Sequence, residues 1–364
     1  MKPNLVLRTT TGVNYYVDPN KASTIYLDKL FFDSSDLSSD DVTAESLKHA
    51  FFNRSQGHEP IQLVWELTNR CNFNCDFCYI RSNKKVAEVD FDEANQLIGI
   101  LVDKGLFHVY LSGGECLLHQ DFIKIYTMLK IRGIIVTVFT NGSLINEEIM
   151  SLWTALPPCC VEITLYDDDF RSDVYRNVIQ LKKAGIKVQL KFTLTKSNLF
   201  VLDKVQNWTD ANGFDLLIDC DLFDGTDDDH CGLVGKYELS LEDKKRLCPW
   251  RYKHIRSESP RIRTMLPCKS IHGGFHIAAD FTLSLCNALQ VRWDLRLIRA
   301  DRALRNLHDL IEEYKDEPMD GCDGCHYPDA CTMCLGHLEK TGTKLIVPSG
   351  YCLETQRIWS YLTS

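Results

Sequence analysis

Sixteen cysteines in a chain of 364 residues are the feature that most limits how this protein can fold. A secreted protein would use so many thiols for disulfides, but the N-terminal residues lack the apolar core of a signal peptide. Cysteines crowded into a chain without an export signal indicate metal or redox chemistry instead. We therefore expect a cytoplasmic protein, part of whose fold is organised around metal.

Charge and hydropathy limit the partners. The formal net charge is −9, whereas a protein that grips a nucleic-acid backbone usually carries a basic excess, so we expect no nucleic-acid partner. No stretch of eighteen or more apolar residues runs without charge, so we expect no membrane span. The 45% hydrophobic and 25% charged residues are typical of a globular chain.

Strand and helix patterns alternate from about residue 61 to residue 219, which predicts an α/β fold. Repeated β–α units give a parallel sheet, either open or curled into a partial (β/α)6 barrel, whose ligands gather at the carboxyl ends of the strands. Residues 59–240 would form this core. A small β-rich prelude would occupy residues 1–58, and a cysteine-rich metal-cluster domain would occupy residues 241–364.

Cys71, Cys75 and Cys78 follow a predicted strand over residues 61–67, with spacers of three and two residues between them. Three thiolates so close in sequence can bind one metal cluster. A 4Fe–4S cube has four irons, so three protein ligands leave one iron open to a small molecule. Structural zinc would need a fourth ligand nearby and would not explain the glycine motifs that follow.

The motif Cys-x3-Cys-x-Phe-Cys resembles that of the radical S-adenosylmethionine (SAM) superfamily, with Phe77 at its aromatic position. The resemblance implies a partial (β/α)6 parallel barrel and a catalytic 4Fe–4S cluster on the three cysteines, with SAM on the open iron. It implies reductive cleavage of SAM to a 5′-deoxyadenosyl radical that abstracts hydrogen from a substrate. An electron donor such as flavodoxin or ferredoxin is then an expected partner.

Two further motifs at strand ends are similar to the SAM contacts of that family. Gly113, Gly114 and Glu115 form a Gly-Gly-Glu segment, in which glycines allow close approach of the backbone to a ligand and an acidic neighbour suits a zwitterionic amino acid. The family usually has Pro next, where this chain has Cys116. The remaining candidate cofactor contacts are Phe77, Asn141 in a Thr-Asn-Gly segment, Thr164 and Lys191.

Cysteines are also concentrated near the C-terminus, where five fall between residues 322 and 352, more than one four-ligand site can use. The pattern resembles the SPASM domain of peptide- and protein-modifying radical SAM enzymes, although one spacer is shorter and the family's glycine falls at Phe281. The resemblance implies two auxiliary iron–sulfur clusters; zinc ribbons are the alternative. The first cluster would be held by Cys268, Cys286 and Cys334, and the second by Cys322, Cys325, Cys331 and Cys352.

Two other thiols have candidate roles. Cys248 is a candidate fourth ligand of the first auxiliary cluster. Cys116, next to the predicted SAM site, is a candidate catalytic hydrogen-atom donor. Free cysteines elsewhere are expected to be small buried hydrophobes.

The resemblance favours an enzyme that modifies a ribosomally made peptide by crosslinking, epimerisation or excision. The prelude is too short for the leader-recognition module of many such enzymes, so we expect a separate leader-binding protein beside the peptide precursor. An anaerobic sulfatase-maturing (formylglycine-forming) enzyme is the alternative within the family. A non-catalytic zinc or electron-transfer protein is the alternative from another class.

Overall fold

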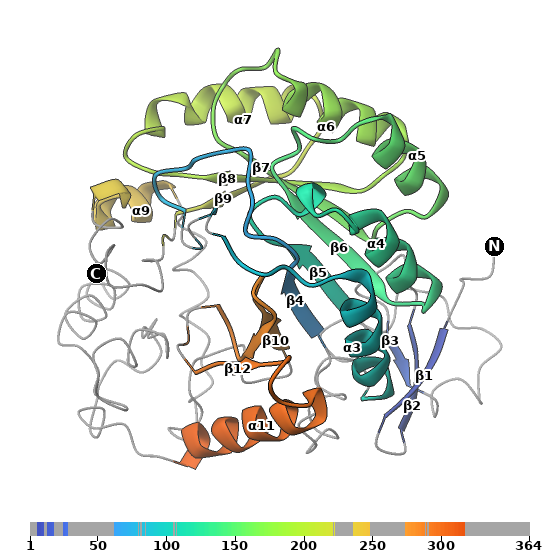
Figure 1. Cartoon of the computed structure of the whole chain (residues 1–364). Helices are drawn as coiled ribbons and strands as arrows, with labels where there is room; N and C mark the ends of the chain where they lie inside the picture. The colour runs from blue at the N-terminus through green and yellow to red at the C-terminus, as the bar shows by residue number, and fades with distance from the viewer. Residues whose placement is uncertain are drawn as a thin grey trace.

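The structure, a computed structural model, describes residues 6–10, 13–17, 25–27, 62–220, 222, 236–247 and 274–316, apart from residues 79, 81, 84, 105, 107, 288 and 290. Its centre is a nine-stranded sheet in the order β12–β11–β10–β4–β5–β6–β7–β8–β9 (Figure 1). Pairing is parallel from β10 to β9 and antiparallel for β11 and β12. The strands are β4 (Gln62–Glu66), β5 (His108–Ser112), β6 (Ile135–Thr140), β7 (Cys160–Leu165), β8 (Val188–Thr193), β9 (Leu216–Asp219), β10 (Gly274–Ile277), β11 (Thr282–Ser284) and β12 (Trp293–Asp294).

Helices connect the successive strands β4 to β9 and lie on the outer side of the curved sheet (Figure 1). Six parallel strands in sequence order with a helix in each connection confirm the predicted α/β fold and partial (β/α)6 parallel barrel. The connecting helices are α3 (Phe91–Asp103), α4 (Phe122–Ile131), α5 (Glu147–Ala155), α6 (Asp173–Lys183) and α7 (Leu202–Ala211). The other helical segments are η1 (Cys116–Leu118), η2 (Leu199–Val201), α9 (Leu241–Leu247) and α11 (Ala300–Asp316).

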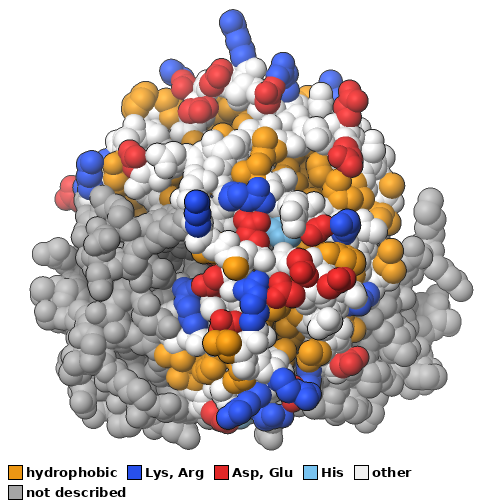
Figure 2. All heavy atoms as spheres, viewed as in Figure 1, with side chains coloured by type: hydrophobic (Ala, Val, Ile, Leu, Met, Phe, Trp, Pro, Cys, Tyr) orange, Lys and Arg blue, Asp and Glu red, His pale blue; other side chains and the backbone are white. Residues whose placement is uncertain are grey.

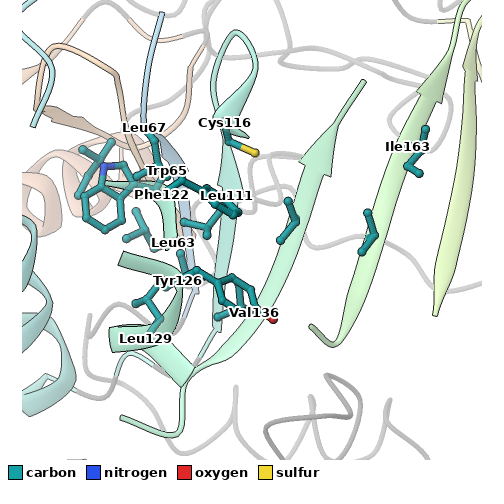
Figure 3. Close-up of a cluster of buried hydrophobic side chains, with 14 of the residues drawn as sticks. Leu63, Trp65, Leu67, Leu111, Cys116, Phe122, Tyr126, Leu129, Val136 and Ile163 are labelled. Atoms are coloured by element: carbon teal, nitrogen blue, oxygen red, sulfur yellow. The ribbon is translucent and has the colours of Figure 1, made fainter. Parts of the chain in front are cut away.

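The two faces of the sheet differ in polarity because side chains alternate along each strand. Leu63 and Trp65 of β4 are fully buried and pack in one cluster with Phe122 and Tyr126 of α4 (Figure 3). Each such side chain contributes about 1.5–3 kcal/mol by its burial. The opposite, inner face carries polar side chains, so the apolar core lies between sheet and helices and leaves the inner face for chemistry.

Near the N-terminus, β1 (Val6–Thr10), β2 (Val13–Val17) and β3 (Ile25–Leu27) form a separate antiparallel sheet. This agrees with the β-rich character expected of the prelude. The domain limits at residues 58 and 240 stay predictions, and β10 to β12 extend the barrel sheet from beyond the second limit.

Basic and acidic side chains are intermixed on the described part of the face in Figure 2, with apolar side chains between them. This pattern gives no broad area of one sign in that view. Among the described helices, none combines the length and apolar character needed to cross a membrane.

Candidate functional site

Three loops meet at the carboxyl ends of β4, β5 and β6. The loop after β4 carries the three cysteines, the loop after β5 carries Gly-Gly-Glu, and the loop after β6 carries Thr-Asn-Gly. Glu115 joins all three, because its backbone N–H donates to Arg70 O at 2.8 Å and its carboxylate accepts from the backbone N–H of Asn141 at 2.8 Å. The parallel strands thus bring together the motifs that the sequence separates.

The thiols of Cys71, Cys75 and Cys78 are half-buried and near enough to influence one another electrostatically. Burial, followed by the charges of Cys78 and Cys71, raises the pKa of Cys75 to about 11. Burial likewise raises the pKa of Cys71. The loop is held at its start by Asn83, which has a left-handed φ of 74° and accepts from Cys71 N at 2.9 Å.

This donor set fits an iron–sulfur cluster. The three thiols influence one another electrostatically, and partial exposure leaves them open to a ligand. Within the described residues, no three His, Cys, Asp or Glu side chains lie close enough to hold a single metal ion. A 4Fe–4S cube has a different requirement, because each cysteine binds its own iron atom of the cluster and the thiols need not meet at a single ion. A metal that binds these thiols must displace their protons, because the thiolate is the ligand.

Gly113 and Gly114 lie directly against the segment that leads to the cysteines. A Cβ on Gly113 would come within 2.4 Å of Thr68 O, and a Cβ on Gly114 within 2.3 Å of Arg70 O. Gly113 also has a φ of 140°, a conformation that favours glycine. The close approach predicted here is therefore made to the protein's own backbone, and it sets the position of the cysteine loop.

The side chain of Glu115 is used within the protein. It is 1% exposed and accepts hydrogen bonds from Thr140 Oγ1 at 2.7 Å, from Asn141 N at 2.8 Å and from Leu117 N at 3.2 Å. Burial raises the pKa of this carboxyl, and the hydrogen bonds from Asn141 and Thr140 act in the opposite direction. A contact of Glu115 with a cofactor would thus come from its backbone carbonyl, since its backbone N–H donates to Arg70 O.

Comparison with known proteins identifies this arrangement. Residues 65–207 match the radical SAM superfamily. This stretch begins in β4 and includes the three loops that meet at the strand ends. The chain contains a radical SAM domain.

Two curated relatives are similar to part of this chain. Fe-coproporphyrin III synthase of Methanosarcina barkeri is 28% identical over 158 residues, which cover 40% of this chain and 39% of the relative. The sporulation killing factor maturation protein SkfB of Bacillus subtilis is 28% identical over 168 residues, covering 43% of this chain and 41% of the relative. This chain thus spans about two fifths of the length of these relatives.

Among solved structures, Streptococcus suis SuiB bound to precursor peptide SuiA is similar, with a TM-score of 0.64. The alignment covers 87% of this chain and 84% of SuiB. Sequence identity is 15%, so the likeness concerns the fold.

Thr164 and Lys191 occupy paired positions on β7 and β8 of the radical SAM domain, on the inner face. Lys191 Nζ forms an ion pair with Asp219 Oδ2 at 2.7 Å. Glu162 lies near both charges, and burial raises its pKa against the opposing effect of Lys191. Lys191 therefore interacts with the acidic side chains of Asp219 and Glu162, which the sequence analysis did not single out. Its contact with a cofactor stays a prediction.

Phe77 and Cys116 have different surroundings. The ring of Phe77 lies 6.2 Å from that of Tyr166 and 6.4 Å from that of Tyr237, within an aromatic group beside the cysteine loop. Cys116 is fully buried in the apolar cluster of Figure 3, and its thiol donates to Phe139 O at 3.3 Å. Burial raises its pKa well above the usual value. This placement is that of a small core residue and gives no support to a hydrogen-donor role for Cys116.

Cys286 is the predicted auxiliary-cluster ligand that the structure describes; it is half-buried after β11. Phe281, where the related domain has glycine, adopts a left-handed φ of 66°. That conformation disfavours most L-residues, so the position has the backbone for which glycine is suited. The other predicted ligands lie outside the described residues: Cys248, Cys268, Cys322, Cys325, Cys331, Cys334 and Cys352.

The sequence analysis missed residues that support the cysteine loop. Asn72 and Ser143 contact Asn141 from the first and third loops, and Asn83 accepts from Cys71 N. Two of them lie next to a motif, Asn72 between two cysteines and Ser143 directly after Thr-Asn-Gly. Their position beside a motif was the signal that the sequence offered. Which residues they contact was not predictable in this way, because the hydrogen bonds of Asn72 join it to residues about 70 positions away.

Proposed function

We propose that this chain is a radical SAM enzyme that modifies a ribosomally made peptide. The observation that carries the proposal is the loop of Cys71, Cys75 and Cys78, held at the strand ends by Gly113 to Glu115. These cysteines would hold the 4Fe–4S cluster, which together with SAM supplies a radical able to abstract hydrogen. Asn141, Thr164 and Lys191 would orient SAM from the neighbouring strand ends.

A peptide substrate is supported by two similarities. The fold shared with SuiB extends beyond the radical SAM domain over most of the chain, and SuiB is described with a bound precursor peptide. SkfB is named as a maturation protein. Crosslinking, epimerisation and excision are the proposed outcomes. Two auxiliary clusters on the C-terminal cysteines, a flavodoxin or ferredoxin donor, and a separate leader-binding protein belong to this proposal.

A tetrapyrrole is the second candidate substrate, because one relative is named Fe-coproporphyrin III synthase. The likeness to that relative covers two fifths of either chain, whereas the likeness to SuiB covers most of both. We therefore favour the peptide.

The first test counts iron and acid-labile sulfide per chain after anaerobic reconstitution. Three cubes predict about twelve irons for the native protein and about eight for a Cys71/Cys75/Cys78→Ala triple variant, since each cube holds four. An unchanged iron count in the triple variant, or stoichiometric zinc in place of iron, would remove the basis for the proposal.

The second test separates the substrates. The reduced protein is incubated with SAM and, in parallel, with short peptides encoded beside its gene, a sulfatase-derived peptide, or coproporphyrin. We expect 5′-deoxyadenosine together with a mass change in a gene-neighbour peptide, and neither in the triple variant. A change confined to the sulfatase peptide or to the porphyrin would assign the chain to that alternative.

A further inference from the structure

Three side chains close a ring of hydrogen bonds beside the cysteine loop. Asn141 Nδ2 donates to Asn72 Oδ1 at 2.9 Å, and Asn72 Nδ2 donates to Ser143 Oγ at 2.8 Å. Ser143 Oγ in turn donates to Asn141 Oδ1 at 2.6 Å. Each member gives one hydrogen bond and accepts one, so all three point the same way around the ring. Hydrogen bonds arranged in this way polarise and strengthen one another.

The side of the ring that belongs to the Thr-Asn-Gly loop is rigidly anchored. Asn141 is 6% exposed, and its backbone N–H donates to Glu115. Gly142 N donates to Thr140 Oγ1 at 3.0 Å, and Gly142 O accepts from Asn177 Nδ2 at 2.8 Å. A Cβ on Gly142 would come within 3.0 Å of the Ile163 side chain. This loop is a fixed platform on which the ring rests.

The other side of the ring is the partly exposed spacer between Cys71 and Cys75, whose Phe73 ring packs edge-on against Tyr166 with centroids 5.8 Å apart. Asn72 is exposed and lies in the spacer between Cys71 and Cys75. Near it, Phe73 N contacts Cys71 Sγ at 3.4 Å, a bond within the loop itself. The ring therefore ties this spacer to the barrel, in addition to the attachment of the loop's start to Asn83.

The ring also limits what Asn141 can offer a ligand. Its Oδ1 accepts from both Ser143 Oγ and Ser143 N, and one of its two Nδ2 hydrogens is given to Asn72. An amide has two donors and one acceptor oxygen, so a single N–H is left over. Most of the Asn141 side chain is occupied in holding Asn72.

We propose that Asn72 and Ser143 are positioning residues that, through Asn141, hold the Cys71–Cys75 spacer in place for its cluster. The inference rests on the proposed function, because it assigns the ring a role toward the proposed 4Fe–4S group. Retention of iron at this site, rather than turnover, is the property that the ring governs.

The test measures how fast iron leaves the three-cysteine site when reconstituted full-length protein meets an excess of EDTA. Release from the Cys71/Cys75/Cys78→Ala variant is subtracted, so that iron bound elsewhere does not count. We expect Asn72→Ala and Ser143→Ala each to speed release about fivefold or more, with the thermal unfolding midpoint unchanged. The double variant should release iron no faster than either single one, because one substitution already opens the ring.

Asn198→Ala is the matched control. The Asn198 side chain accepts from Thr195 N at 2.8 Å and donates to Thr193 O at 2.9 Å. Both partners belong to the end of β8 and the loop after it, and not to the cysteine loop. The Asn198→Ala variant should release iron at the wild-type rate.

Release from both ring variants within twofold of wild type would overturn the inference and leave the proposed function standing. Equal acceleration in Asn198→Ala would also overturn it, since the effect would then be general. If the triple-cysteine variant retains all the iron of the wild type, no cluster occupies the site, and both proposals fall.

Discussion

At the scale of single residues, Gly114 is a point where the Gly-Gly-Glu loop leaves no room for a side chain against the start of the cysteine loop. A Cβ would lie 2.3 Å from Arg70 O, a backbone atom that cannot swing aside. We expect Gly114→Ala to lower the free energy of unfolding by about 1–3 kcal/mol and to reduce iron uptake at the three-cysteine site. Urea unfolding and iron per chain measure both effects.

Gly99→Ala is the control for that change. Gly99 lies inside α3, and nothing lies within 4 Å of an added Cβ. Alanine in a helix interior should raise stability by about 0.5–1 kcal/mol. Equal stability of Gly114→Ala and the wild type would contradict the close approach.

His108 should make the fold sensitive to mild acid. Burial lowers the pKa of this imidazole to about 3, whereas an unfolded histidine titrates near 6.5. As the pH falls below about 6.5, the unfolded chain takes up a proton that the folded chain refuses until about pH 3, so stability is lost through this window. Between pH 7.5 and 5 the loss amounts to about 2 kcal/mol.

His108→Phe removes the titrating group and keeps a ring in the place where His108 stacks on Tyr110 at 4.0 Å. The variant loses the hydrogen bond to Thr137 at every pH, so its stability is compared with its own value at pH 7.5. We expect urea unfolding at pH 5 to show about 2 kcal/mol less acid loss than in the wild type. Parallel pH profiles for the two proteins would refute the prediction.

At the scale of elements, a buried polar pair joins β10 to β4. His276 Nε2 lies 3.0 Å from Glu66 Oε1, a close polar contact that falls outside hydrogen-bond geometry. Both residues are buried, and His276 Nδ1 lies 3.3 Å from Ser284 Oγ. Removing one partner strands the other in an apolar setting, so we expect His276→Leu to cost about 3 kcal/mol in urea unfolding.

The matched change removes both partners. Replacing both partners of a buried polar contact by apolar side chains of similar volume is often neutral, so Glu66→Leu/His276→Leu should recover most of the lost stability. A double variant less stable than His276→Leu would show that the two side chains do not act as a pair.

At the scale of the whole molecule, the sheet crosses the predicted domain limit at residue 240. β10 pairs in parallel with β4 and contributes the buried Phe275 and Ile277 to the core. A chain ended at residue 240 would leave β4 as an open edge, which invites association between molecules. We expect it to aggregate in size-exclusion chromatography, whereas a chain ended at residue 316 keeps the strands β10 to β12. A monomeric, cooperatively unfolding 1–240 chain would instead support the predicted limit.

The sequence was sufficient for the barrel because its signals are local. Periodic apolar positions mark the helices and strands, and side-chain caps mark the start of some helices; α3, for example, begins at a capping box of Asp90 and Glu93. The Cys71–Cys78 motif and its resemblance likewise depend on spacing within a few residues, and the match of residues 65–207 to the superfamily agrees with them.

Only the tertiary structure decided how the motifs are used. The Glu115 side chain accepts hydrogen bonds from within the protein, and Cys116 lies in the apolar core. Both outcomes depend on contacts with residues that are distant in sequence. Asn72 donates a hydrogen bond to Ser143, 71 positions away. Spacing within a segment determines which residues can share a cluster, whereas burial and hydrogen-bond partners arise when separate strands are packed side by side.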